Sequence, residues 1–380
     1  MHDTVIVDAI RTPFAKRGGA YTQLRPDTLL AAQLGALVQR TGVDPARIGD
    51  VIAGCVSQAG EQAANVGRQA ALLAGLPVEV PAVTMNRMCS SGQSTAHFAA
   101  QAVAAGDMDY AIACGVESMS RVPMFLDVTL GAPFRDWSGL NPDLLERHVL
   151  PAQADSAELV AKQWSLSRRD LDDFAAESHR KAHQSSAIAQ RELVPVPGCD
   201  LRVDEGVRPR VDREKMASLQ PLSGPGGVIT AANASQMTDG AAALLVARAD
   251  VARADGLRPR ARFRARVVMG SDPRLQLDGV IPATRAALAR AGVGLGDLDW
   301  IEVNEAFACV PLAWARELGA DIADVNPWGG AIAHGHPLGA TGLGLVAKAL
   351  AGLESTGGTL ALVVFCAGHG MATATVLERL

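Results

Sequence analysis

Aromatic residues are scarce in this chain of 380 residues: they make up 4% of it, and only two are tyrosines. Proteins that bind single-stranded nucleic acid stack the bases on aromatic side chains, so a surface of that kind is not expected. No charge of one sign dominates either, because the formal net charge is −5. A general electrostatic attraction to nucleic acid or to an anionic membrane is therefore excluded, and any recognition of phosphate must come from local basic clusters.

Long apolar runs and paired-cysteine motifs are also missing. The longest apolar runs, such as residues 360–367, are too short to span a bilayer. None of the six cysteines belongs to a CxxC motif, and residues 4–9 look like a strand rather than a secretory leader. We therefore expect reduced cysteines in a soluble, cytoplasmic protein with no membrane partner.

What the chain does contain is small and apolar. Hydrophobic residues make up 48%, charged residues 20%, and there are 38 glycines. Helices rich in alanine and glycine pack closely on sheets, which favours a layered α/β architecture.

The two halves of the chain repeat one plan. Each half has a helix that ends at glycine, a strand, a second helix made of small residues, and a buried strand that runs into glycine. Near-constant offsets of 250, 247 and 252 residues separate three equivalent pairs: Gly42 and Gly292, Cys89 and His336, and Cys114 and Cys366. Such offsets indicate a duplicated fold, and packing about a pseudo-twofold axis would bring Cys89, His336 and Cys366 into one pocket.

The order strand, helix, strand, helix, strand predicts two mostly parallel sheets with helical layers, and active residues at the carboxyl ends of the strands. Residues 120–245 interrupt the repeat with a charged helical stretch and a segment rich in Pro, Gly and Arg. We predict an N-terminal half over residues 1–119, an inserted subdomain that covers the pocket over 120–245, and a C-terminal half over 246–380. The alternative is a long surface excursion.

Cys89 lies where a strand should turn into a helix. Free backbone N–H groups and the positive end of the helix dipole would both lower the pKa of its thiol. The alternative is a buried, inert cysteine. The polar and small residues around it, within 86–92, favour a site where a ligand approaches the backbone closely.

His336 and Cys366 are the matching candidates of the second half. His336 lies in a glycine-rich loop before a helix, where it could accept a proton from Cys89 or donate a hydrogen bond to a carbonyl oxygen. Cys366 ends an apolar strand at a glycine turn, so its thiol could exchange a proton with a substrate carbon while N–H groups of the turn stabilise an oxyanion. The alternatives are a structural histidine and an inert cysteine.

The remaining polar patterns give weaker indications of a functional site. Asn304, after the strand 300–303, could hold a water or a carbonyl oxygen, or could merely form a turn. His334 and His336 lack further ligands at metal spacing, so no metal site is predicted. The arginines at 258, 260, 262, 264 and 266 alternate along a strand and are interpreted as a solvated or ion-paired face, and the pair His179 and His183 as part of a surface helix.

Taken together, these motifs resemble the thiolase family, and the resemblance runs along essentially the whole chain. The segments that carry it are residues 7–14, 86–92, 115–120, 304–307, 329–337 and 366–368. The resemblance implies a five-layered αβαβα fold of two duplicated halves, with an inserted loop domain that binds coenzyme A. It also implies an acyltransferase that exchanges thioesters while making or breaking a carbon–carbon bond.

The resemblance also implies a role for each motif residue. Cys89 would be the nucleophile that takes the acyl group as a thioester, and His336 its activator. Cys366 would move the proton of the acetyl-CoA carbanion. One oxyanion hole would consist of His336 and a water on Asn304, and the other of the N–H groups of Cys89 and Gly368. Coenzyme A, as co-substrate, would contact three further residues: Arg208, Ser235 and Phe307.

The chain departs from the family pattern at three places. His369 and Ala372 stand in the C-terminal turn where the family usually has glycine, and Ala232 replaces the glycine before Asn233. The segment 152–155 reads Ala-Gln-Ala-Asp where the family usually has a Met-Gly pair. That segment borders the acyl pocket.

We therefore predict a thiolase that cleaves 3-ketoacyl-CoA to acetyl-CoA and a shortened acyl-CoA, the degradative direction of fatty acid β-oxidation, or that runs the reverse condensation. One alternative is a biosynthetic acetoacetyl-CoA thiolase. Another is a non-catalytic acyl-CoA- or lipid-binding protein of the same shape. The expected partners are acyl-CoA substrates and coenzyme A, with no prosthetic group and no nucleic acid, and the expected assembly is a homodimer or homotetramer.

Overall fold

The computed structural model describes residues 2–129, 140–186, 188 and 191–380. Its strands are β1 (Thr4–Arg11), β2 (Ala15–Lys16), β3 (Ile48–Gly54), β4 (Ala82–Met85), β5 (Tyr110–Ser118), β6 (Thr238–Arg248), β7 (Ala261–Gly270), β8 (Trp300–Val303), β9 (Leu360–Ala367) and β10 (Met371–Arg379). The helices of the first half and the intervening segment are α1 (Pro26–Thr41), α2 (Val66–Leu73), α3 (Ser91–Ala105), α4 (Leu126–Thr129), α5 (Pro142–Arg147), α6 (Gln153–Gln163), α7 (Arg168–Ser185) and α8 (Arg213–Ser218). The remaining helices are α9 (Ala249–Ala254), α10 (Val280–Ala291), α11 (Cys309–Leu318), α12 (Ala331–His334) and α13 (Leu338–Thr356).

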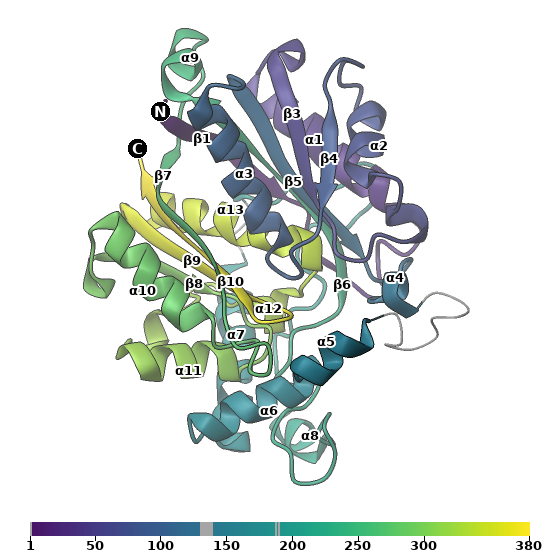
Figure 1. Cartoon of the computed structure of the whole chain (residues 1–380), viewed down its shortest axis with the longest axis vertical. Coiled ribbons are helices and arrows are strands. Elements are labelled where there is room, and N and C mark those ends of the chain that lie inside the picture. Colours follow the sequence, from purple (N-terminus) through teal and green to yellow (C-terminus); the bar gives the residue numbers. More distant parts are fainter. Residues whose placement is uncertain (1, 130–139, 187, 189–190) are drawn as a thin grey trace.

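Duplication is visible in the sheets. The strand order β3-β5-β6-β1 in the first half repeats as β8-β9-β10-β7 in the second. The edge strand β4 pairs with β3, and a single bridge between Ile301 and Val325 occupies the equivalent place beside β8. The two sets join where β1 pairs briefly with β7 (Figure 1). The α/β class and the duplicated thiolase-like fold expected from the sequence are therefore confirmed.

The expectation of mostly parallel sheets is wrong. Only β3 with β4, β3 with β5 and β8 with β9 run parallel within the described sheet, whereas β6 and β10 run antiparallel to both of their long neighbours. The short turn 368–370 forces β9 and β10 into a hairpin. Because β9 is buried on both faces, its sequence is a continuous apolar run, the pattern that usually marks parallel strands.

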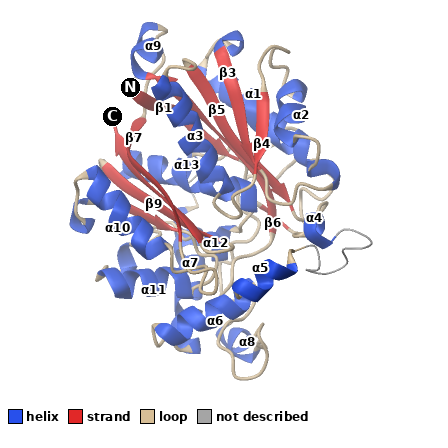
Figure 2. Ribbon diagram, in the orientation of Figure 1, coloured by secondary structure: helices blue, strands red, loops and turns tan. Residues whose placement is uncertain are grey.

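Helices cover both outer faces of the paired sheets and fill the space between them (Figure 2). Helices α1 and α2 pack on the first sheet and α10 on the second, while α3 and α13 pack against each other in the central layer. Three clusters of buried apolar residues occupy the spaces between these layers. This is the five-layered αβαβα arrangement.

Glycine lets the two central helices meet at their N-termini. A Cβ on Gly92 of α3 would lie 2.6 Å from the carbonyl oxygen of Gly339 in α13, and one on Gly342 would overlap the backbone of Gln93. Only glycine permits backbones to approach this closely. The residues that precede the two helices, Cys89 and His336, are brought together for this reason.

The segment between the halves supplies helices α4–α8 and then returns to the first sheet. The predicted boundary at residue 245 falls inside β6, which pairs with β1 and β5. The three-part division of the chain stays a prediction.

Among the described residues, no helix combines the length and the hydropathy needed to cross a membrane.

Candidate active site

Cys89 and His336 line one pocket of about 170 Å³. Its walls come from both halves and from the segment between them. The lining residues are Cys89, Met119, Met124, Gln153, Leu222, Ala234, Ser235, Gln236, Met237, Ala306, Phe307, His336 and Leu338. A thiol and an imidazole 247 positions apart in the sequence therefore face the same space.

The backbone before α3 turns sharply to present Cys89. Met88 adopts a left-handed conformation with φ of 48°, and its N–H donates to Oδ1 of Asn86 over 2.7 Å. Cys89 then stands two positions before the first residue of α3, with its side chain buried. A positive φ outside glycine is uncommon and marks a position where the surrounding structure fixes the backbone.

The electrostatics of Cys89 differ from the sequence expectation of a lowered thiol pKa. Burial raises the pKa of the Cys89 thiol to about 11, and hydrogen bonds from Gln153 and from the N–H groups of Gly368 and Cys89 offset only part of that rise. The helix terminus is present, but the loss of water outweighs it. Cys89 is therefore a neutral thiol at neutral pH and needs a base.

His336 is held with one ring nitrogen free to accept a proton. The Oγ1 hydroxyl of Thr341 donates its proton to the carbonyl oxygen of Pro337 over 2.8 Å. Oγ1 itself is therefore free to accept a hydrogen bond from Nδ1–H of His336, also over 2.8 Å. The proton thus sits on Nδ1, and Nε2 keeps its lone pair with no partner among the described residues. Burial lowers the pKa of His336 to about 4, so the ring is neutral and Nε2 can accept a proton.

Cys366 lies near Cys89 although it is not one of the lining residues. Burial raises the pKa of the Cys366 thiol well above its ordinary value, and the neighbouring thiols of Cys89 and Cys309 add to that rise. Cys366 therefore holds its proton. It stands second from the end of β9, opposite Ala372 across the hairpin.

The turn after β9 contains His369, one of the departures from the family pattern. His369 adopts φ of 62°, a conformation that favours glycine, and its N–H donates to Oε1 of Gln276 over 3.0 Å. The side-chain amide of Gln276 donates in turn to the carbonyl oxygen of Pro151 and to Oγ of Ser156. This chain of hydrogen bonds fixes the turn that aims the N–H of Gly368 at the sulfur of Cys89.

Asn304 follows β8 at the same edge. Its backbone N–H donates to the carbonyl oxygen of Val364, and its side chain is 1% exposed with neither amide atom partnered among the described residues. A buried amide without partners is costly, which is a reason to expect a ligand or water there. Asn304 is not itself a lining residue, whereas Ala306 and Phe307 are.

The three residues expected to contact coenzyme A fall along one route. Ser235 and Phe307 line the Cys89 pocket, and Arg208 lines a neighbouring pocket of about 240 Å³. The two pockets share Ala234 and Gln236. Together they extend from the thiol to an exposed arginine.

This second pocket also holds residues that the sequence interpretation misplaced or missed. His179, expected on a surface helix, is buried: its Nδ1 accepts from the N–H of Arg208 over 3.2 Å, and burial lowers its pKa to about 4. His183, one turn on, is exposed as expected. Lys215 adds a second cation beside Arg208. Nothing in the sequence singled out Lys215, because lysine near the start of a short helix is common on any surface.

Gln153 and Thr341 are further residues whose importance the sequence did not show. The amide nitrogen of Gln153 lies 4.0 Å from the sulfur of Cys89, at the place where the segment departs from the family pattern. Thr341 stands in the first turn of α13 and fixes the tautomer of His336. The departure from the family pattern at residues 152–155 could have drawn attention to Gln153. A threonine in a helix gives no comparable indication of function.

Two buried polar networks hold the site in place. Glu117 accepts from the N–H groups of Val56, Ser57 and Gly339, which ties β5 to the start of α13. Asp204 bonds both to Arg11, over 2.7 Å, and to His334, over 2.7 Å. The loop that carries His336 is thus attached to β1 and to the intervening segment. Groups of three or more potential metal ligands are absent from the described ranges.

The arginines after residue 257 behave largely as expected. Arg260 pairs with Asp8 and Glu354, while Arg262 and Arg264 share Glu378. Arg266, the last of the series, is buried in part.

Comparison with known proteins agrees with this geometry. The family model described as "Thiolase, N-terminal domain" matches residues 4–250, and "Thiolase, C-terminal domain" matches residues 257–379. The chain is 44% identical to the steroid 3-ketoacyl-CoA thiolase FadA6 of Mycobacterium tuberculosis, over 100% of this chain and 95% of that protein. It is 43% identical to the 3-oxoadipyl-CoA/3-oxo-5,6-dehydrosuberyl-CoA thiolase of Escherichia coli, over the full length of both.

Solved structures agree with the family models and with the similar sequences. The acetyl-CoA acetyltransferase of Bacillus anthracis superposes with a TM-score of 0.91 at 33% identity, over 100% of this chain and 99% of that one. The human mitochondrial 3-ketoacyl-CoA thiolase superposes with a TM-score of 0.90 at 32% identity and the same coverage. Family models across the chain, full-length relatives and the shared fold together show that this protein belongs to the thiolase family.

Proposed function

We propose that this acyltransferase cleaves 3-ketoacyl-CoA with coenzyme A, and that Cys89, His336, Cys366 and Asn304 perform the chemistry. The observation that carries the proposal is the shared pocket of Cys89 and His336, with a neutral thiol facing an imidazole whose Nε2 has a free lone pair. A neutral thiol beside a neutral base suits nucleophilic catalysis by proton transfer.

In the first step Cys89 attacks C3 of the substrate. Its thiol proton moves to Nε2 of His336 as the bond between sulfur and C3 forms, and the carbonyl oxygen becomes an alkoxide. The N–H groups of Cys89 and Gly368, which already face the sulfur, are suited to stabilise that charge.

In the second step the alkoxide collapses and the bond between C2 and C3 breaks. The acyl group stays on Cys89 as a thioester, and the electron pair leaves on the enolate of acetyl-CoA. The side-chain amide of Asn304, directly or through water, would hold the enolate oxygen together with His336. Cys366 gives its proton to C2, which its raised pKa supports because the thiol is protonated at neutral pH.

In the third step coenzyme A releases the acyl group. Its thiol proton restores Cys366, its sulfur attacks the acyl-Cys89 carbonyl, and the sulfur of Cys89 recovers the proton held by His336. The products are acetyl-CoA and an acyl-CoA shortened by two carbons. Thiols and one imidazole account for every proton.

Arg208 and Lys215 are proposed to bind the phosphates of coenzyme A at the outer pocket, and Ser235 and Phe307 to border its pantetheine. The support is the continuity of the two pockets from these cations to Cys89. Guanidinium and ammonium groups are the side chains that proteins use for phosphate.

The degradative direction is the preferred one, on the resemblance of residues 86–92 to that branch. The relatives named above act on steroid 3-ketoacyl-CoA and 3-oxoadipyl-CoA, so a 3-ketoacyl-CoA longer than acetoacetyl-CoA is proposed as the substrate. The acetyl-CoA acetyltransferase among the solved structures keeps acetoacetyl-CoA synthesis as a second candidate.

The test is CoA-dependent release of acetyl-CoA from linear, branched and dicarboxylic 3-ketoacyl-CoAs by the wild type, Cys89→Ala and Cys366→Ala. We expect wild-type cleavage of at least one compound longer than acetoacetyl-CoA, and loss of at least a thousandfold in both variants. Binding of these compounds without cleavage by the wild type would favour a non-catalytic protein instead.

We also propose a cytoplasmic homodimer that pairs through an edge strand. All six cysteines are free, which suits a reducing compartment. The edge strand β4 leaves Val83 45% exposed, and an uncovered edge is a natural pairing surface. Size-exclusion chromatography with light scattering would give the mass, and a Val83→Lys variant would show whether β4 forms the contact.

A further inference from the structure

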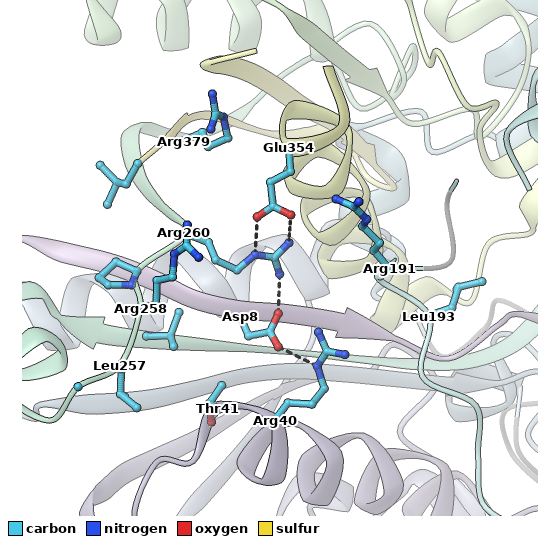
Figure 3. Close-up of a pocket in the computed structure, with 14 residues that line it drawn as sticks. Asp8, Arg40, Thr41, Arg191, Leu193, Leu257, Arg258, Arg260, Glu354 and Arg379 are labelled. Carbon is cyan, nitrogen blue, oxygen red and sulfur yellow. Dashed lines mark hydrogen bonds and ion pairs between the residues drawn. The ribbon is translucent and has the colours of Figure 1, made fainter. Parts of the chain in front are cut away.

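A larger depression, of about 780 Å³, lies where the two halves join and shares no lining residue with the pockets around Cys89 (Figure 3). It is bordered by β1, the end of α1, the residues before β7, the end of α13 and the end of β10. Its volume lies within the range of about 300–1,000 Å³ typical of small-molecule sites. The proposed thiolase reaction makes no use of it.

Arginine dominates the charged lining. Among the described residues, the side-chain carboxylates of Asp8 and Glu354 and the terminal carboxylate of Leu380 face five guanidinium groups: Arg40, Arg191, Arg258, Arg260 and Arg379. The C-termini of α1 and α13 offset this excess, each by about half a charge. The depression remains positive within a chain whose net charge is −5, so the clustering is local and does not reflect a basic protein.

Three of these arginines are already held by the protein. Arg260 donates to Asp8 and, through two nitrogens, to Glu354, and Nε of Arg40 donates to Asp8 over 2.9 Å. Arg379 donates to the carbonyl oxygens of Gly357 and Gly358 after α13. These contacts hold the three side chains in place within the wall of the depression, so a structural role accounts for each of them.

Arg191 and Arg258 remain without any carboxylate partner among the residues that the structure describes. Both are exposed, yet both stand on fixed backbone. Next to Arg191, the backbone of Glu192 accepts from the N–H of Arg11, and two residues after Arg258 the N–H of Arg260 donates to the carbonyl oxygen of Ile6. Two free guanidinium groups are therefore presented at defined places on the rim.

We propose that this depression, hereafter the arginine pocket, binds a small molecule that carries a diphosphate group. A guanidinium fork matches the oxygens of phosphate, and a diphosphate has enough charge and acceptors for several forks at once. Leu193, Leu257 and Pro259 provide an apolar wall for the organic part. Within the part of the chain that the structure describes, no aromatic side chain lines the arginine pocket, which disfavours stacked nucleic acid bases as the ligand.

Isothermal titration calorimetry of the full chain with pyrophosphate and with ADP tests this proposal. Coenzyme A is left out because it carries a diphosphate itself. Every protein in these titrations also carries Arg208→Ala and Lys215→Ala, so that binding does not report on the pocket of Arg208. We expect pyrophosphate and ADP to bind this background protein, with ADP the tighter of the two because of the apolar wall. Raising the salt concentration should weaken both.

The double variant Arg191→Ala/Arg258→Ala should weaken pyrophosphate binding at least tenfold. The matched control Arg169→Ala/Arg285→Ala removes the same charge from side chains that are 90% and 58% exposed elsewhere, and should change binding less than twofold. The single variant Arg258→Gln, which keeps most of the side chain, should show an intermediate loss and guards against misfolding of the double variant.

Three results would overturn the proposal: no binding of either compound to the background protein, equal weakening by the control pair, or binding that survives in the double variant. Introduced into the wild type without the background changes, the substitutions at positions 169, 191, 258 and 285 should leave thiolase activity the same. The proposal therefore succeeds or fails independently of the proposed reaction.

Discussion

At the scale of single residues, the protonation state of Cys89 determines how the proposed reaction would start. The thiol lies before a helix N-terminus, yet burial raises its pKa to about 11, while burial lowers the pKa of His336 to about 4. Both groups are thus neutral between these values. The free enzyme holds a thiol and an imidazole, and not a preformed ion pair.

This state predicts how alkylation of Cys89 depends on pH. Below a thiol pKa of about 11 the thiolate fraction grows about tenfold for each pH unit. The rate of Cys89 modification by iodoacetamide, followed by peptide mass spectrometry, should therefore rise about tenfold per unit between pH 7 and pH 9. Cys199, the half-buried free thiol, serves as an internal reference. A rate that stays constant from pH 6 to pH 8 would indicate a thiolate–imidazolium pair instead.

The sequence predicts which residues could react, and that assignment stays a prediction, but it does not predict their electrostatics. The motifs around Cys89, His336 and Cys366 could be recognised because glycine, proline and polar residues cluster there. The pKa of Cys89 could not be predicted, because it depends on how much water the segment around Met124, Gln153 and Leu222 excludes. Thr341 was missed for a similar reason: its effect depends on a hydrogen bond whose geometry no spacing rule reports.

At the scale of elements, the contact between the N-termini of α3 and α13 aligns the site. It depends on glycines that leave no room for a side chain, since a Cβ on Gly92 would lie 2.6 Å from the carbonyl oxygen of Gly339. Separating the two helices would move Cys89 away from His336.

A Gly92→Ala variant tests this contact. Overpacking at this contact should destabilise the protein by about 1–3 kcal/mol and lower kcat/KM at least tenfold. The control is Gly35→Ala in α1, where an added Cβ meets nothing within 4 Å. That change should raise stability by about 0.5–1 kcal/mol and leave activity alone. Thermal unfolding and steady-state rates measure both; an active, stable Gly92→Ala enzyme would show that the close approach is not required.

Helix and strand positions in both halves could be predicted from periodicity and glycine stops. Strand direction could not, because most of β6 and all of β9 are buried on both faces and, like parallel strands, consist of apolar residues. The start of β6 could not be predicted for another reason. The strand begins at Thr238, directly after a long irregular segment that has no counterpart in the repeat.

At the scale of the whole molecule, one buried network joins all three parts of the chain. Asp204 of the intervening segment bonds to Arg11 on β1 and to His334 beside the loop of His336. Although burial opposes ionisation, Arg11 and His334 hold the pKa of Asp204 well below its usual range. A depressed carboxylate pKa contributes stability above its unfolded value, and that contribution is lost as the pH falls.

Replacing Asp204 with Asn should therefore destabilise the protein by about 3–5 kcal/mol at pH 7, because Arg11 loses a buried partner. The destabilisation should shrink below pH 4, where the wild type itself begins to lose this contribution. The matched control is Asp200→Asn, an exposed position in the same segment, which should change stability by less than about 0.5 kcal/mol. Chemical denaturation at pH 7 and pH 3 measures both, and equal effects of the two substitutions at pH 7 would contradict the role of the network.

The duplication itself could be predicted from offsets between equivalent residues, since a repeated fold repeats its glycine stops and buried strands. The network could not, because Arg11, Asp204 and His334 come from three separate segments and nothing local marks them as partners.

The central claim is that a thiol from one half and an imidazole from the other act in a single pocket. Mass spectrometry of the protein mixed rapidly with a cleavable 3-ketoacyl-CoA, without free coenzyme A, measures this most directly. The wild type should carry the shortened acyl group on Cys89, and His336→Ala should form that adduct at least a hundredfold more slowly. An adduct on another cysteine, or an undiminished rate in His336→Ala, would contradict the account.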